Sequence, residues 1–273
     1  MARTGATLVL CLSLALSSAL SAATGDIPRE SRSVMVGGKA ELWQLVWEGK
    51  PSSVCGPEDV ETAMTCPCTG FAYGEMGRLS LVRKSGGKEI ERMALGPLFA
   101  ELPADNSAGL AAMQWRPFNS RDFDIGTGDD KAAQARLHSA IKARKGPQVM
   151  KMMDLDHDGQ ASEFLIQVAA GPCGHTDYVA VGVSKAKPRL HALSTAIGAD
   201  KGEVLNLPGS AWQVLAGAKG SGKVTSWPCG DHGSERREEL VLSARGGRIS
   251  VKSRSYSCPE DGSAEKLIEE QQL

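Results

Sequence analysis

The residues with the clearest chemical meaning lie in one short segment near the middle of the chain. Residues 154–163 read Asp-Leu-Asp-His-Asp-Gly-Gln-Ala-Ser-Glu, so three aspartates alternate with other residues and a glycine follows the third. Calcium is a hard cation that takes roughly six to eight oxygen ligands. Aspartates on alternate residues around a tight turn point their carboxylates at one centre, and the segment therefore predicts a calcium site.

The expected ligands are distributed along the whole loop. Gly159 lets the backbone turn sharply, and His157, at a variable position, is expected to point outward. Carboxylates are expected from the first, third, fifth and tenth positions, a backbone carbonyl from the seventh and a bound water at the ninth: Asp154, Asp156, Asp158, Glu163, Gln160 and Ser162. Because every ligand is local in sequence, the ion is expected to be structural and to pin adjacent strands. The alternative is a turn rich in aspartate and glycine that binds no metal.

These ten residues resemble the calcium-binding loops of EF-hands and of FG-GAP/VCBS-type β-propeller blades. An EF-hand has a bidentate glutamate at position twelve, where this chain has Leu165, and its loop is followed by a helix. Here residues 164–168 alternate and are β-branched, which favours a strand. A strand on either side of the loop is the arrangement of a propeller blade, although blade loops usually have an acid at position nine, where this chain has Ser162. The resemblance implies a calcium site and covers only the loop and its flanks.

Two other motifs suggest chemistry less specifically. Residues 217–224 almost match a phosphate-binding loop, but Val224 stands where Ser or Thr must reach Mg²⁺, and no helix is expected to follow. We therefore interpret this segment as a flexible surface loop and expect no nucleotide. The Cys-Gly-His sequence at 173–175 and the Cys-Gly-Asp-His sequence at 229–232 carry ligands suited to zinc or copper, but an oxidising compartment favours disulfides.

The sequence carries no clear signature of an enzyme. Nucleophilic catalysis needs a Ser or Cys beside a base and an orienting acid, and no Gly-x-Ser-x-Gly elbow occurs in a suitable context. We therefore expect a binding or structural role. The competing hypothesis is a secreted hydrolase whose active site is built from residues distant in sequence, with His175 or His232 and nearby acids.

The beginning of the chain indicates export. Arg3 is followed by an uncharged stretch rich in Leu, Ala, Val and Ser, with small-residue cleavage patterns near its end, so residues 1–23 are interpreted as a cleaved signal peptide. The mature chain is expected to be secreted or periplasmic, with no membrane span. The 31 basic and 32 acidic residues of the chain provide no strong field to attract nucleic acid. The expected partner is an extracellular or envelope ligand, either protein or glycan.

The cysteine count also fits an exported chain. Seven cysteines become six when Cys11 leaves with the signal peptide, and an even number favours disulfides. The pairing stays open, although short spacing favours a bond from Cys55 to Cys66 or Cys68.

The remaining pattern predicts a mainly β fold with a few short helices. Three segments each combine an apolar strand, a short turn and a second strand: residues 79–95, 163–184 and 239–255. Helices are expected at residues 129–145, 210–215 and 264–273. The expected architecture is a hairpin-built β-sandwich or a set of propeller-like sheets, stabilised by disulfides.

The chain also suggests an order of units. A flexible leader is expected at 24–40, an N-terminal β unit with a Cys-rich loop at 41–128, and a β unit containing the calcium-type loop at 129–273. The two β units are equally compatible with a single domain.

Overall fold

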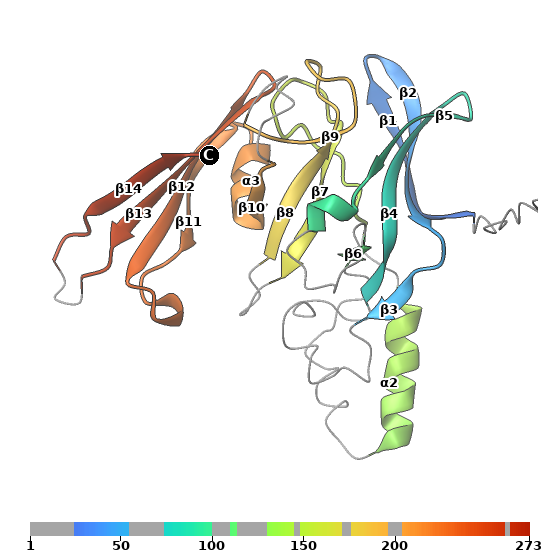
Figure 1. The fold of residues 1–273 in the computed structure, drawn as a ribbon, viewed down its shortest axis with the longest axis horizontal. Coiled ribbons are helices and arrows are strands. Elements are labelled where there is room, and N and C mark those ends of the chain that lie inside the picture. Colours follow the sequence, from blue (N-terminus) through green and yellow to red (C-terminus); the bar gives the residue numbers. More distant parts are fainter. Residues whose placement is uncertain are drawn as a thin grey trace, which may run out of the picture.

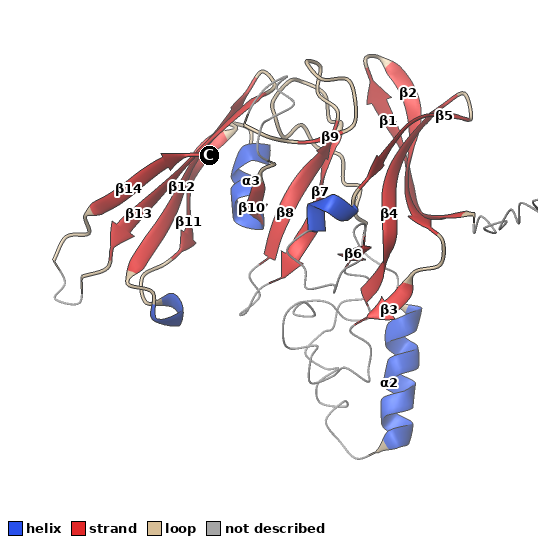
Figure 2. Cartoon of the chain, viewed as in Figure 1, coloured by secondary structure: helices blue, strands red, loops and turns tan. Residues whose placement is uncertain are grey.

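The protein is a mainly β molecule built from three antiparallel sheets, as the hairpin pattern predicts. The structure, a computed structural model, describes residues 25–54, 74–99, 110–113, 130–144, 148–170, 176–195, 204–259 and 263–273. The three sheets follow one another along the long axis of the molecule in chain order (Figure 1, Figure 2). The expected signal peptide, Cys55, Cys66, Cys68, Cys173 and His175 lie outside the described residues.

The N-terminal sheet has six strands, and its longest member is paired on both sides. The strands are β1 (Asp26–Val36), β2 (Lys39–Glu48), β3 (Ser52–Val54), β4 (Gly74–Ser85), β5 (Lys88–Ala94) and β6 (Leu110–Met113). The second half of β4 lies between β2 and β5, and its first half pairs with β3 and β6. The 3-10 helix η3 (Gly96–Phe99) follows β5 and contributes buried Phe99.

The segment expected as a flexible leader is instead a strand. β1 pairs with β2 from the Asp26–Glu48 pair to the Val36–Lys39 pair, and a turn at Gly37 and Gly38 joins them. Its sequence looks polar and aperiodic because β1 is an edge strand in which only Val34 is fully buried. Backbone pairing, rather than side-chain burial, therefore orders this segment.

The middle sheet packs against the N-terminal sheet in the manner of a β-sandwich. It contains β7 (Glu163–Ala170), β8 (Thr176–Gly182), β9 (His191–Ala192) and β10 (Asn206–Pro208), with β8 in the centre. Side chains of both sheets share one hydrophobic cluster, here called the first core, which includes Trp43, Leu45, Leu79, Leu81, Phe164, Ile166, Val179 and Val181. This core fixes the position of β7, the strand that begins at the last residue of the predicted calcium loop.

The C-terminal sheet packs on the middle sheet through a short helix. It contains β11 (Ser221–Trp227), β12 (Arg236–Arg245), β13 (Arg248–Ser257) and β14 (Leu267–Gln272), and α3 (Gly209–Ala216) lies between it and the middle sheet (Figure 1). A second hydrophobic cluster, here called the second core, joins these elements and includes Leu155, Ala180, Leu207, Trp212, Leu215, Leu240, Leu242 and Val251. The expected helix at 210–215 is thus present.

The C-terminal segment expected as a helix is a strand. Residues of β14 pair with β13 from Lys252–Gln272 to Tyr256–Leu267 and are exposed along the whole strand. The sequence Ala264–Leu273 reads as helical because Glu, Gln and Leu are good helix formers, but pairing with the β13 edge overrides this propensity. The expected helix at 129–145 is confirmed as α2 (Lys131–Ala143), and Asp130 caps it by accepting bonds from the amides of Ala132 and Ala133.

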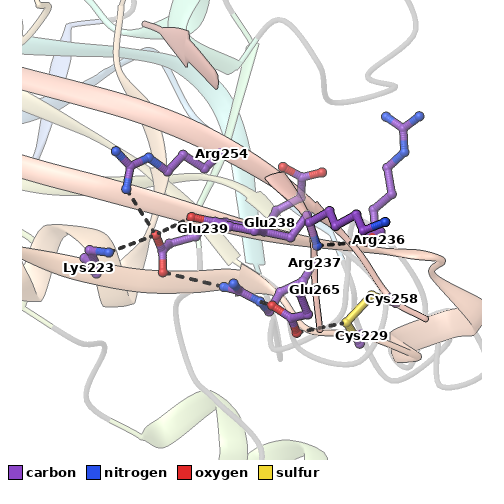
Figure 3. A network of polar contacts seen from close by, with 12 residues as sticks. Lys223, Cys229, Arg236, Arg237, Glu238, Glu239, Arg254, Cys258 and Glu265 are labelled. Carbon is purple, nitrogen blue, oxygen red and sulfur yellow. Dashed lines mark hydrogen bonds and ion pairs between the residues drawn. A yellow bond between two sulfur atoms is a disulfide. The ribbon is translucent and has the colours of Figure 1, made fainter. Parts of the chain in front are cut away.

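A network of ion pairs lies on the outer face of the C-terminal sheet, and a disulfide lies beside it. Figure 3 shows Lys223, Arg237 and Arg254 converging on Glu239, at N–O distances of 3.3, 3.6 and 3.9 Å. Cys229 and Cys258 are bonded beside this network, so the disulfide expectation holds for this pair. Among the described residues, none belongs to a helix long and apolar enough to cross a membrane.

Candidate metal centre

The predicted calcium loop is closed at its base by a pair of backbone hydrogen bonds. The amide of Met153 donates to the carbonyl of Glu163 at 2.7 Å, and the amide of Glu163 donates back to Met153 at 3.1 Å. Glu163 is also the first residue of β7. The strand expected after the loop is therefore present as β7, whereas on the side before the loop only Met153 pairs, through an isolated bridge to Glu163.

Three carboxylates of this loop converge. One ligand oxygen from each of Asp154, Asp156 and Glu163 lies within 4.8 Å of the other two. Asp156 and Glu163 are 1% and 0% exposed, and Oδ2 of Asp156 is buried without a hydrogen-bond partner. Across the described part of the chain, no Lys, Arg or His forms an ion pair with any of the three. The cluster therefore consists of two buried acids and one half-buried acid, Asp154, without an ion-pair partner in this part of the chain.

The backbone of the loop holds the first two aspartates in place. Oδ1 of Asp154 and Oδ1 of Asp156 both accept the amide of Asp158 at 3.0 Å, and Oδ2 of Asp154 accepts the amide of Gly159 at 2.9 Å. Gly159 has φ of +87°, a conformation that favours glycine. The predicted sharp turn is thus present, and it gathers side chains two residues apart.

Burial and mutual repulsion make these carboxylates hard to ionise. Burial raises the pKa of Asp156, and the negative charges of Asp158 and Asp154 raise it further, while the Asp158 amide opposes the rise. The Ser184 hydroxyl also opposes it, although it lies outside hydrogen-bond geometry and leaves Oδ2 without a partner. Burial, followed by the charge of Asp156, raises the pKa of Glu163 to about 9. Both shifts have the cause expected when like charges share a low-dielectric site without a cation.

Two hydrogen bonds to the carboxyl of Glu163 offset part of the rise in its pKa. Oε2 accepts the amide of Leu155 at 3.0 Å. The Ser162 hydroxyl lies 2.7 Å from the carbonyl oxygen of Val183 and 3.1 Å from Oε1 of Glu163. The Ser162 hydroxyl is the donor in both contacts, and its bond to Oε1, like the bond from the Leu155 amide, favours the charged form of Glu163.

The other three predicted ligands have side-chain oxygens engaged elsewhere. Those of Asp158 accept the amides of Gln160 and Lys185, at 2.7 and 2.5 Å. Oε1 of Gln160 accepts the amide of Gly37 in the β1–β2 turn at 2.9 Å. The backbone carbonyl of Gln160 therefore stays the atom expected to bind the ion. The hydroxyl of Ser162 faces Val183 and Glu163, as above. The structure thus gathers Asp154, Asp156 and Glu163, and the roles of the other three stay predictions.

His157 does not point into solvent as the sequence suggested. It has φ of +55°, and its Nε2 lies 2.7 Å from the carbonyl oxygen of Leu215 at the end of α3. The backbone carbonyls of Asp156 and His157 accept the amides of Gly247 and Gly246, at 2.8 and 2.9 Å. The sequence predicted a hairpin turn at Gly246 and Gly247. Nothing in it indicated that this turn contacts residues 154–163, here called the metal loop.

The weaker motifs have other structural roles. The segment that almost matches a phosphate-binding loop continues as strand β11 from Ser221, rather than forming a flexible surface loop. Cys229 is in a disulfide and so cannot be a thiolate ligand. The His232 side chain, like His175, lies outside what the structure describes, so the hydrolase hypothesis stays untested.

No protein-family model, curated protein or solved structure matches this chain. The case for function therefore rests on the geometry of the metal loop.

Proposed function

We propose that this protein is an exported calcium-binding protein in which one ion has a structural role. The ion is held by Asp154, Asp156 and Glu163, with Asp158, the Gln160 carbonyl and a water near Ser162 completing the shell. It reinforces the link between β7 and Met153, which precedes the loop. No catalytic role is assigned to the site.

The observation that carries the proposal is the orphaned Oδ2 of Asp156. A buried carboxylate oxygen without a hydrogen-bond partner is costly, and two further carboxylates within 4.8 Å make its ionised form worse. A divalent cation among the three would supply the missing partner and neutralise the repulsion. A turn rich in aspartate and glycine that binds no metal would gain no stability from burying two carboxyl groups in this way.

The chemistry of the donors favours calcium over softer metals. All converging ligand atoms are carboxylate oxygens, whereas zinc and copper sites use imidazole or thiolate. The one histidine in the loop directs its ring nitrogen to Leu215 rather than to the triad. Calcium tolerates irregular coordination at a larger radius, whereas magnesium requires near-ideal octahedral geometry and gives up water reluctantly.

Calorimetric titration and thermal unfolding test the proposal together. Calcium should bind with a dissociation constant on the order of 10⁻⁴ to 10⁻³ M, the range of extracellular modules. At 100 times that constant, linkage predicts about 2.7 kcal/mol of added stability. Magnesium should give a much smaller effect. If melting temperatures in excess calcium and in chelator agree, the loop is only a turn.

A matched pair of variants separates the site from general charge effects. Asp156→Asn keeps the size of the side chain but removes the charge, and should abolish calcium-dependent stabilisation. Glu269→Gln removes one acid from exposed β14 and should leave the calcium-dependent stabilisation unchanged. Equal calcium responses in both variants would contradict the assignment of the site.

Export is supported by two features. Residues 1–23 have the composition of a signal peptide, and the Cys229–Cys258 disulfide suits an oxidising compartment. N-terminal sequencing of exported protein should find a start between Ala22 and Thr24.

A further inference from the structure

The metal loop lies where all three sheets meet. The β1–β2 turn of the N-terminal sheet reaches it through the bond from the Gly37 amide to Gln160. The middle sheet holds it through the bridge at Glu163 and the contact of Ser162 with Val183. The C-terminal sheet reaches it through the turn between β12 and β13. The loop therefore contacts elements of all three sheets.

The β12–β13 turn binds the loop backbone between two of the proposed ligands. The amides of Gly247 and Gly246 donate to the carbonyls of Asp156 and His157. A Cβ atom at Gly247 would lie 3.7 Å from Oδ2 of Asp156 and 3.6 Å from Cβ of Asp158. The tip of the C-terminal sheet is thus in van der Waals range of the orphaned ligand oxygen.

A second turn of the same kind shows that this contact is not a general property of hairpins. Gly86 and Gly87, between β4 and β5, have φ of +56° and +79°, close to the +58° and +82° of Gly246 and Gly247. A Cβ atom at Gly86 or Gly87 would meet nothing within 4 Å. The two turns therefore share a backbone shape, but only one of them touches the metal loop.

Side chains of the loop form a second connection to the C-terminal sheet. Leu155, between the first two aspartates, is fully buried in the second core, which includes Leu240 and Leu242 of β12. Its amide donates to Oε2 of Glu163. His157, two residues after Leu155, contacts the end of α3. One proposed ligand thus holds the residue that enters the core shared with the C-terminal sheet.

We propose that ion binding at this loop controls how firmly the C-terminal sheet is docked, so that the metal site regulates the junction between the sheets. This inference rests on the proposed function. With the ion bound, Asp154, Asp156 and Glu163 are drawn to one centre, which fixes the backbone of residues 154–157. That backbone presents the two carbonyls that receive the turn. Without the ion, the three carboxyl groups lose the centre that draws them together, so the backbone of residues 154–157 is held less firmly and presents its two carbonyls to the turn less rigidly.

Hydrogen exchange on the full-length mature protein tests the coupling directly. In calcium, the amides of Gly246 and Gly247 should exchange at least about fivefold more slowly than in chelator, the lower end of typical coupling between sites. The amides of Gly86 and Gly87 in the β4–β5 turn, which lies away from the metal loop, should change less. Equal changes in the two hairpins would overturn the inference, because the ion would then stabilise the whole protein evenly.

A matched pair of variants tests the same coupling in the other direction. By reciprocity, if calcium strengthens docking of the turn by some factor, the docked state binds calcium more tightly than the undocked state by the same factor, so a change that undocks the turn should weaken calcium binding by up to that factor. Gly247→Val should raise the calcium dissociation constant at least about fivefold, since it strains the turn and crowds Asp156. Gly87→Val imposes similar strain at a turn that contacts nothing and should leave the constant within about twofold of wild type.

The outcomes separate this inference from the proposed function. If the wild-type protein binds no calcium in titration, the proposed function fails and the docking inference falls with it. If it binds calcium but Gly247→Val binds equally well, only the docking inference fails. If Gly247→Val does not fold, the hydrogen-exchange comparison on the wild-type protein decides.

Discussion

Nε2 of His157 lies 2.7 Å from the carbonyl oxygen of Leu215, so the metal loop is tied to the last turn of α3 by a residue that is not itself a proposed ligand. Because a carbonyl only accepts, the histidine must carry its proton on Nε2. His157 adopts φ of +55°, which histidine, asparagine and aspartate tolerate better than most residues.

Replacing His157 should therefore weaken the fold without removing a ligand. His157→Asn keeps a residue that accepts the left-handed conformation but is too short to reach Leu215, and should cost about 1 kcal/mol, a typical net hydrogen bond. Urea unfolding in saturating calcium measures the loss. Gln213, which is exposed on α3, gives a control: Gln213→Asn should change stability by less than about 0.5 kcal/mol. Equal effects of the two changes would mean that the contact with Leu215 contributes nothing.

The N-terminal sheet makes a separate prediction at Arg83. Its guanidinium is nearly buried and donates two bonds of 2.8 Å to Glu41 and one of 2.6 Å to Glu91. Removing one partner of a buried charge network leaves the others uncompensated, so Arg83→Ala should cost about 3–5 kcal/mol. Arg78 is the matched control, since its side chain is 66% exposed and lies 3.9 Å from Glu48. Arg78→Ala should cost at most about 1 kcal/mol by the same unfolding measurement.

The pairing of Cys229 with Cys258 can be tested chemically, and its contribution to stability can then be measured. Digestion of the unreduced protein should yield a peptide pair joined through Cys229 and Cys258, which are 29 residues apart. A loop of that length restricts the unfolded chain enough to contribute about 3–4 kcal/mol. The double change to serine should lower stability by that amount, and free thiols at both positions in the exported protein would contradict the assignment.

Local patterns predicted the loop and the hairpins, because both depend on residues close in sequence. The alternating aspartates and Gly159 specify a turn that gathers Asp154 and Asp156, and glycine pairs specify tight hairpins. The segments read wrongly were edge strands. Both β1 and β14 lie at a sheet edge and bury few side chains, so alternation of apolar residues, the main signal for a strand, is absent from them.

What surrounds the metal loop was not predictable, because it depends on contacts between distant segments. Leu155 looks like a spacer between ligands, yet it is buried in the second core. Gly247 looks like any other turn glycine, and only its position in the fold, beside Oδ2 of Asp156, distinguishes it from Gly87. Sequence alone identified the candidate site, but not that the site joins three sheets.

The raised pKa of Glu163 predicts an unusual pH dependence in the absence of metal. Its pKa is about 9 in the folded protein, against an ordinary value of 4.5. Between these values the folded state keeps a proton that the unfolded state has lost. Stability from this group is therefore fully present below about pH 4.5 and is lost as the pH rises through about 9. Asp156, whose pKa is also raised, acts in the same direction, whereas the lowered pKa of His191 opposes it below about pH 6.5.

Thermal unfolding in chelator from pH 5 to pH 9 isolates the contribution of Glu163 when it is compared with Glu163→Gln. The glutamine is neutral at every pH, as the protonated glutamate is, so the two proteins should have similar melting temperatures at low pH. Above neutral pH the wild-type protein must either hold a buried charge or release it by unfolding, and it should become the less stable of the two. In excess calcium the order should reverse at high pH, because the ion requires a carboxylate, which the glutamine variant lacks. If the wild-type and variant curves stay parallel in chelator, Glu163 titrates normally and is not buried beside Asp156 as the structure has it.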